Sequence, residues 1–164
     1  MGAGVWVCDE WECGRAPAIL LLSPCLPHGR SKVPKNILII DDSAVFRRLL
    51  RSHLEDRGHL VFEAEDGQEA ISHLNLCVPA VANTVTGPNT PDLIVLDVLM
   101  PIMDGYTFIQ RLRRQLPEHV RGTPVICLTS RSKMRDLFEM EGVQGFVEKT
   151  PEGLEELVSL VDDM

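Results

Sequence analysis

A short apolar run that ends in two acids, Ile37-Leu38-Ile39-Ile40-Asp41-Asp42, decides the fold predicted for this sequence. A second run, Asp92-Leu93-Ile94-Val95-Leu96-Asp97, has the same form. An unbroken apolar run of this length is typical of a strand covered on both faces, as in a parallel sheet. Both runs therefore predict buried parallel strands, each with a carboxylate at its carboxyl end.

Outward from these two runs, the sequence alternates between strand and helix signals. Three further apolar runs predict strands at residues 60–62, 125–128 and 145–147. Apolar side chains at helical spacing predict helices at residues 43–57, 67–74, 105–115, 132–141 and 152–161. Gly58 and Gly142 are expected to close the first and fourth helices, and Asp104 to cap the start of the third. This alternation predicts an α/β fold with a doubly wound parallel sheet.

The chain is expected to consist of one domain and an extension. Residues 1–35 have neither helical nor strand periodicity, which predicts a flexible, disordered N-terminal segment. Residues 36–164 hold all of the predicted strands and helices, and this length suffices to bury a core. Since the fifth predicted helix is the last element of the sequence, no attached output domain is expected.

Composition excludes several classes of function. The formal net charge is −8, and an acidic domain repels nucleic-acid phosphates, so direct nucleic-acid binding is not expected. No stretch approaches the roughly 20 apolar residues of a membrane span. The five cysteines are odd in number, and Cys127 lies inside an apolar run, where it is expected in the core. These features predict a cytoplasmic protein.

The predicted strands deliver polar side chains to one edge of the sheet. They end in Asp41-Asp42, Asp97, Thr129-Ser130 and Glu148-Lys149. In an open parallel sheet the carboxyl ends of the strands form the ligand-binding edge. Carboxylates about 4 Å apart repel by roughly 4 kcal/mol at an effective dielectric constant near 20, and Lys149 alone cannot neutralise three of them. Hard oxygen ligands with open positions for water favour Mg²⁺ as the compensating ion.

Phosphoryl transfer is the chemistry that these groups suggest. A carboxylate beside Mg²⁺ can act as the nucleophile and form an acyl phosphate. The Thr129 hydroxyl and the Lys149 ammonium are suited to contact the phosphoryl oxygens. Simpler roles also fit single residues, because Asp42 or Ser43 can cap the first helix and Lys149 can be a solvated surface side chain. His53, His59 and His73 lack metal spacing and are expected to be solvated.

The order of these motifs resembles the response-regulator receiver family. The resemblance rests on Asp41-Asp42, the segment Asp97-Val98-Leu99-Met100-Pro101-Ile102-Met103-Asp104-Gly105, Leu128-Thr129-Ser130 and Lys149. The segment Glu65-Asp66-Gly67-Gln68-Glu69-Ala70 is also similar to the start of that family's second helix. The similarity covers residues 36–164 and implies a single flavodoxin-like (βα)5 domain with strand order 2-1-3-4-5.

Family residues carried over by position imply a phosphorylation site. The resemblance implies that Asp97 accepts a phosphoryl group from a phosphohistidine on a sensor histidine kinase or a phosphotransfer protein. It also implies that Asp42 and Asp97 bind Mg²⁺ directly and that Asp41 binds it through water. The backbone carbonyl of Leu99 would complete the protein ligands.

The resemblance further implies a conformational switch. Thr129 would turn toward the phosphoryl group, Lys149 would contact it, and the ring of Phe146 would rotate inward. A purely structural place for Phe146 in the core remains an alternative. The result of phosphorylation would be a changed surface for an unidentified downstream protein, rather than catalytic turnover.

Two features depart from the family pattern. Receivers usually place a proline in a cis peptide directly after the lysine, whereas Thr150 stands between Lys149 and Pro151 here. Two alternatives stay open: a cis bond before Thr150, which costs about 2.5–4 kcal/mol, or a different loop that presents the lysine. Residues 74–91 form an unusually long, uncharged segment that reaches the opposite edge of the sheet, where it is not expected to touch the chemistry.

Three other functions compete with this interpretation. A haloacid dehalogenase-type phosphatase needs a second carboxylate two residues after the nucleophile, where Leu99 stands instead. A flavodoxin-type cofactor carrier needs a phosphate-binding loop after the first strand, for which Asp41-Asp42-Ser43 is electrostatically unsuited. The third is a phosphorylation-independent, receiver-like interaction module, which the insertion of Thr150 leaves open.

Overall fold

The computed structural model describes residues 33–77, 90–129 and 135–164 of the chain. The predicted flexible extension lies almost wholly outside these residues, as do Ser130 and most of the long segment 74–91. Lys35, the last residue of the predicted extension, already belongs to the domain. Its carbonyl accepts a hydrogen bond from the Leu60 amide, and its ammonium donates one to the Val161 carbonyl.

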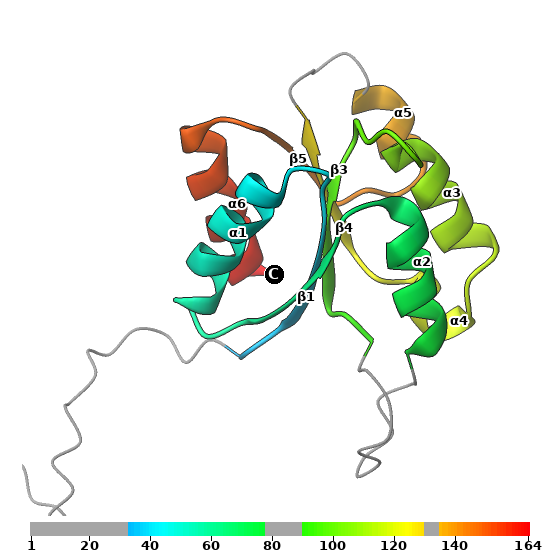
Figure 1. The fold of residues 1–164 in the computed structure, drawn as a ribbon, viewed down its shortest axis with the longest axis horizontal. Coiled ribbons are helices and arrows are strands. Elements are labelled where there is room, and N and C mark those ends of the chain that lie inside the picture. Colours follow the sequence, from blue (N-terminus) through cyan, green and yellow to red (C-terminus); the bar gives the residue numbers. More distant parts are fainter. Residues whose placement is uncertain (1–32, 78–89, 130–134) are drawn as a thin grey trace, which may run out of the picture. The chain divides into compact units, whose positions relative to one another are not determined.

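Five parallel strands form one sheet (Figure 1). They are β1 (Asn36–Ile40), β2 (Leu60–Ala64), β3 (Leu93–Asp97), β4 (Val125–Thr129) and β5 (Gly145–Glu148). Their order across the sheet is β2-β1-β3-β4-β5, and each neighbouring pair is parallel. The predicted flavodoxin-like topology is therefore confirmed, and it makes β1 and β3 direct neighbours.

Six helices occur among the described residues. They are α1 (Ala44–Glu55), α2 (Gly67–Leu76), α3 (Gly105–Arg114), α4 (Glu118–Arg121), α5 (Arg135–Met140) and α6 (Pro151–Asp163). The helix α4 was not predicted, because a single turn of four residues is too short to reveal a helical period. Within the described parts of the chain, no helix has the length and apolar character that crossing a membrane requires.

The helices cover the sheet on both faces (Figure 1). Helices α1 and α6 pack on one face, against alternate strand residues such as Ile37 and Ile39. Helices α2, α3, α4 and α5 pack on the other face, against Leu38 and Ile40. All five residues of β3 are buried, as expected for a central strand covered on both sides. The two apolar layers bury the central strands, so their polar residues are found at the strand ends.

Side-chain caps fix where the helices beside the strand ends begin. The Ser43 hydroxyl accepts a hydrogen bond of 3.4 Å from the Phe46 amide at the start of α1. The Asp104 carboxylate accepts one of 2.7 Å from the Thr107 amide at the start of α3, which confirms its predicted role as N-cap. These caps satisfy orphan backbone N–H groups and hold the loops after β1 and β3 in place.

The expectation that His59 is solvated is wrong. Its ring is buried, with a relative exposure of 3%. Its Nδ1 accepts a hydrogen bond of 3.2 Å from the Lys35 amide, and its Nε2 lies 3.3 Å from a carboxylate oxygen of Asp162 near the end of α6. Sequence spacing did not reveal the burial of His59, because its two partners come from the first and last parts of the domain's sequence. His59 therefore joins the start of β1 to the last helix.

Candidate functional site

The carboxyl ends of four strands bring their polar residues to one edge of the sheet. Asp41 and Asp42 follow β1, Asp97 is the last residue of β3, and Thr129 is the last residue of β4. Lys149 follows β5, where its amide donates a hydrogen bond of 3.1 Å to the Thr129 carbonyl. The predicted strand-end constellation is therefore assembled at a single edge.

The three aspartates form one cluster. Each offers a carboxylate oxygen that lies within 4.8 Å of those of the other two. Asp41 and Asp97 are buried, with relative exposures of 0% and 4%, whereas Asp42 is exposed to solvent. Two buried acids beside an exposed one give a cluster of negative charge that solvent reaches at Asp42.

Lys149 is the cation that contacts this cluster in the described residues. Its ammonium lies 2.6 Å from a carboxylate oxygen of Asp41 and 2.6 Å from one of Asp97. Only 18% of its side chain is exposed. One lysine against three carboxylates leaves the cluster with an excess of negative charge when all of them are ionised.

Burial shifts the pKa of the acid that lies deepest. Desolvation raises the pKa of Asp41, with a smaller contribution from the charge of Asp97, and these effects outweigh the opposing influence of Lys149 and Ser43. For Lys149, burial favours the neutral form, but the contacts with both carboxylates prevail and hold its pKa above the ordinary value. A further cation in the cluster would favour ionised Asp41.

One carboxylate oxygen of Asp41 is suited to such a cation. Its Oδ1 accepts a hydrogen bond of 2.8 Å from the Ser43 amide. Its Oδ2 is fully buried and lies 2.6 Å from the ammonium of Lys149, which Asp97 shares. A set of three carboxylates with one shared ammonium keeps an excess of negative charge, which fits a small hard divalent ion such as Mg²⁺.

Backbone contacts orient the carboxylate of Asp97. Its Oδ1 accepts a hydrogen bond of 3.1 Å from the Leu99 amide, while its Oδ2 faces Lys149. Gly105 lies so close that a Cβ atom there would come within 2.7 Å of the Asp97 carbonyl oxygen. A glycine at position 105 is thus needed for the close approach of α3 to the end of β3.

The insertion of Thr150 has a structural explanation in the start of α6. Thr150 is the N-cap of this helix, and its hydroxyl accepts a hydrogen bond of 3.0 Å from the Gly153 amide. Pro151 takes the first helical position, where a proline is well tolerated. No cis peptide bond occurs among the described residues. Of the two alternatives, the structure therefore has the different loop, and that loop still directs Lys149 into the cluster.

Gly153 makes this loop compact. A Cβ atom at Gly153 would lie 2.0 Å from the Glu148 carbonyl oxygen. The same carbonyl accepts a hydrogen bond of 2.8 Å from the Thr150 amide. Only a glycine therefore fits beside the end of β5, a requirement that the sequence pattern did not reveal.

The remaining predicted residues lie around the cluster in different settings. Thr129 is buried at the end of β4, with an exposure of 1%. The side chain of Leu99 is 44% exposed. Phe146 is half-buried and meets the ring of Phe138 edge-on, with 5.5 Å between the ring centroids. Its place against the core agrees with a structural role and leaves rotation as a prediction.

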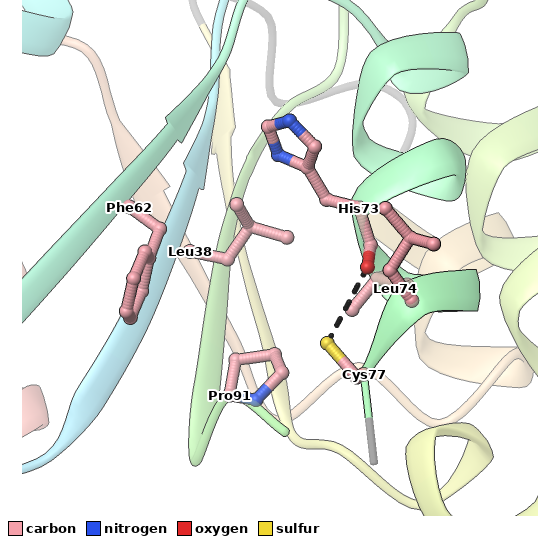
Figure 2. A pocket seen from close by; sticks show the side chains of 7 residues that line it. Leu38, Phe62, His73, Leu74, Cys77 and Pro91 are labelled. Carbon is pink, nitrogen blue, oxygen red and sulfur yellow. Dashed lines mark hydrogen bonds between the residues drawn. The ribbon is translucent and has the colours of Figure 1, made fainter. Parts of the chain in front are cut away.

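Figure 2 shows a separate cavity, beside α2. It has a volume of about 210 Å³, and among the described residues it is lined by Leu38, Phe62, His73, Leu74, Leu76, Cys77 and Pro91. The Cys77 thiol points back to α2 and donates to the His73 carbonyl, as Figure 2 shows. The lining is mostly apolar and holds none of the predicted site residues.

Comparisons with known proteins agree with this geometry. Residues 37–162 match the family model of the response regulator receiver domain. The chain is 37% identical over 110 residues to the transcriptional regulatory protein ResD of Bacillus subtilis (strain 168), a match that covers 67% of this chain and 37% of ResD.

Two solved structures share the fold. The chemotaxis response regulator CheY4 of Vibrio cholerae superposes with a TM-score of 0.62 at 27% identity, over 79% of this chain and 99% of CheY4. The response regulator TrrA of Thermotoga maritima, in complex with Mg²⁺-BeF, superposes with a TM-score of 0.60 at 26% identity, over 79% of this chain and 97% of TrrA.

The chain therefore belongs to the response regulator receiver family, the CheY-like signalling domains of two-component systems. It spans about a third of the length of the curated relatives that it matches. What their other parts do is not carried over to this chain.

Proposed function

We propose that this domain is a phosphorylation switch in which Asp97 accepts a phosphoryl group while Mg²⁺ is bound beside it. The observation that carries the proposal is the convergence of Asp41, Asp42 and Asp97 within 4.8 Å, with the Lys149 ammonium against two of them. A carboxylate nucleophile, a site for a divalent ion and a fixed cation are the groups that phosphoryl transfer to an aspartate needs.

The proposed phosphoryl donor is a phosphohistidine. A carboxylate oxygen of Asp97 attacks phosphorus, an O–P bond forms, and the P–N bond of the donor breaks, which leaves an acyl phosphate and a free histidine. Water later attacks the acyl phosphate and releases inorganic phosphate. The donor is a sensor histidine kinase or a phosphotransfer protein, in keeping with the family, and the domain itself is a signalling module.

Each acid of the cluster has a part in holding the ion. Asp42 and Asp97 are proposed as direct ligands, Asp41 as a ligand through water, and the Leu99 carbonyl as the fourth protein contribution. When bound, Mg²⁺ neutralises charge on the phosphoryl oxygens and on the acids. The three carboxylates within 4.8 Å of one another, with one shared ammonium and a raised pKa at Asp41, support an ion at this place.

Phosphorylation is proposed to change the domain through Thr129, Lys149 and Phe146. Hydrogen bonds to charged groups contribute about 1.5–3 kcal/mol each. Two such bonds, from the hydroxyl of Thr129 and the ammonium of Lys149, approach the roughly 5.5 kcal/mol that inverts a 1:99 population. In the sheet register Phe146 pairs with Cys127, and Thr129 stands two residues further along β4, where side chains return to the same face of the sheet. The switched surface is proposed to bind a downstream protein.

Mass spectrometry of the intact protein tests the proposal. Wild type incubated with acetyl phosphate and Mg²⁺ is expected to gain the mass of one phosphoryl group. Asp97→Ala and the wild type in excess EDTA are expected to gain none. A wild type that stays unmodified, yet binds its partners equally with and without the phosphodonor, would instead favour the phosphorylation-independent interaction module.

A further inference from the structure

Phe46 contacts the lysine of the cluster from a different element. The Lys149 ammonium lies over the Phe46 ring, 5.0 Å from its centroid. Phe46 stands in the first turn of α1, where its amide donates to the capping hydroxyl of Ser43. Its ring is half-buried and packs against the apolar layer beneath α1 and α6. The ring therefore packs against the core on one side, while its face meets the half-buried ammonium of Lys149.

We propose that Phe46 is a positioning residue that holds the Lys149 ammonium toward Asp97 by a cation–π contact. This inference rests on the proposed function, because it concerns how Lys149 meets the phosphoryl group. An ammonium on a flexible four-carbon chain needs fixed neighbours to keep one direction. An aromatic face within about 6 Å attracts it, and the attraction is stronger where water is excluded.

The contact matters because the other partners of Lys149 change during the reaction. Both of its ion pairs are with Asp41 and Asp97, at 2.6 Å each. Under the proposed function, Asp97 becomes an acyl phosphate and Asp41 faces a divalent ion. The ring of Phe46 keeps its charge distribution through both events. Phe46 thus supplies the contact that stays constant while the carboxylates change partners.

The local loop gives Lys149 a backbone position but not a side-chain direction. The Thr150 cap and the close approach at Gly153 fix the start of α6. Neither contact touches the ammonium. The Phe46 ring belongs to α1 rather than to this loop, and it contacts the ammonium itself. It is therefore suited to fix the direction of the Lys149 side chain.

Substitution of Phe46 tests the inference with acetyl phosphate as the phosphodonor. Phe46→Leu is expected to slow phosphorylation of Asp97 by about three- to tenfold, whereas Phe46→Trp is expected to stay within about twofold of wild type. Phe62 gives a matched control, since it is 43% exposed and lines the separate cavity, whose described lining includes no site residue. Phe62→Leu is expected to leave the rate unchanged.

A series of fluorinated phenylalanines at position 46 separates the contact from simple packing. Successive fluorine atoms weaken the negative face of the ring and barely change its shape, so the rate is expected to fall stepwise along the series. The same series at Phe62 is expected to give a flat line. A flat line at Phe46, or equal losses in the Leu and Trp variants, would overturn the inference.

A spectroscopic readout distinguishes this inference from the proposed function. In the unphosphorylated wild type, the ε-methylene protons of Lys149 are expected to resonate upfield through the ring current of Phe46, and to lose this shift in Phe46→Leu. A shift that is present in a protein that acetyl phosphate does not modify would contradict the proposed function alone. Unshifted protons in the wild type would contradict the contact itself.

Discussion

The two edges of the sheet treat buried polar groups in opposite ways. At the amino edge, each ring nitrogen of the buried His59 has a partner, one on Lys35 and one on Asp162. At the carboxyl edge, the buried Asp41 must share the ammonium of Lys149 with Asp97, and burial raises the pKa of Asp41. The first arrangement stabilises the fold, whereas the second reduces stability and leaves a site that a cation can complete.

The same contrast extends to the apolar surroundings of each edge. The cavity bordered by Cys77 and Pro91 is lined mostly by apolar side chains and lies apart from the acids. At the carboxyl edge, backbone elements approach closely enough that Gly105 and Gly153 have no room for a side chain. His59 at the amino edge is therefore expected to affect stability alone, whereas residues at the carboxyl edge are expected to affect stability, phosphorylation or both.

The largest effect on stability is expected for Gly153→Ala. Its Cβ atom would lie 2.0 Å from the Glu148 carbonyl oxygen, so the loop after β5 must move. The free energy of unfolding is expected to fall by about 3 kcal/mol or more, as in other overpacked sites. Gly122→Ala is the control, because a Cβ atom there meets nothing within 4 Å. Urea unfolding that gives equal losses for both variants would contradict the close approach.

His59→Ala is expected to destabilise the domain without slowing phosphorylation. The substitution removes a buried ring and leaves the Lys35 amide and the Asp162 carboxylate without that partner, at a cost of about 2 kcal/mol. His73→Ala, on a side chain that is 46% exposed, is expected to change little. Thermal unfolding and the acetyl phosphate assay check the two halves of the prediction. A slower reaction in the folded His59 variant would mean that the edges are coupled.

Asp41→Asn is expected to make the metal-free protein more stable at neutral pH. The pKa of Asp41 in the folded state is raised above its ordinary value of 3.8. The contribution of Asp41 to stability is therefore fully present below pH 3.8 and is lost as the pH rises through the pKa of the folded state. Asparagine has no charge to desolvate, so the free energy of unfolding of the variant is expected to exceed that of the wild type by about 1 kcal/mol near pH 7. This difference is expected to vanish in acid. Asp42→Asn, on an exposed residue, is the control. A variant that is less stable than wild type at every pH would refute this account of the cluster.

The smallest effect is expected for Leu99→Asn. The Leu99 side chain is 44% exposed beside Asp97, where we expect it to shield the acyl phosphate from water. The variant should lose its phosphoryl group roughly threefold faster at unchanged stability. Ile102→Asn, on a side chain that is 72% exposed in the same loop, serves for comparison. Identical decay rates for wild type and Leu99→Asn would leave Leu99 as a passive loop residue.

The sequence predicted the sheet and the acidic cluster because both follow from local patterns. Apolar runs mark buried strands, and the residue after each run must lie at the carboxyl edge. The runs that end at Asp41 and Asp97 therefore suffice to place both acids at this edge. The caps at Ser43 and Asp104 are equally local, since they depend on a few neighbouring residues.

Other features were beyond sequence patterns because they depend on distant contacts. The burial of His59 comes from Asp162 on the last helix, and the contact of Phe46 with Lys149 joins the first helix to the end of β5. The need for glycine at position 153 depends on how closely α6 approaches the Glu148 carbonyl. Such distances between elements have no signature in spacing or composition.

Paramagnetic broadening by Mn²⁺ tests most directly whether the three carboxylates hold a divalent ion. In a ¹⁵N-labelled sample, substoichiometric Mn²⁺ is expected to erase the amide signals of Asp41, Asp42, Asp97 and Leu99 first, and excess Mg²⁺ is expected to restore them. The signals of Cys77 and His59, at the other edge, should persist. Uniform broadening, or broadening that begins away from the aspartates, would contradict the account.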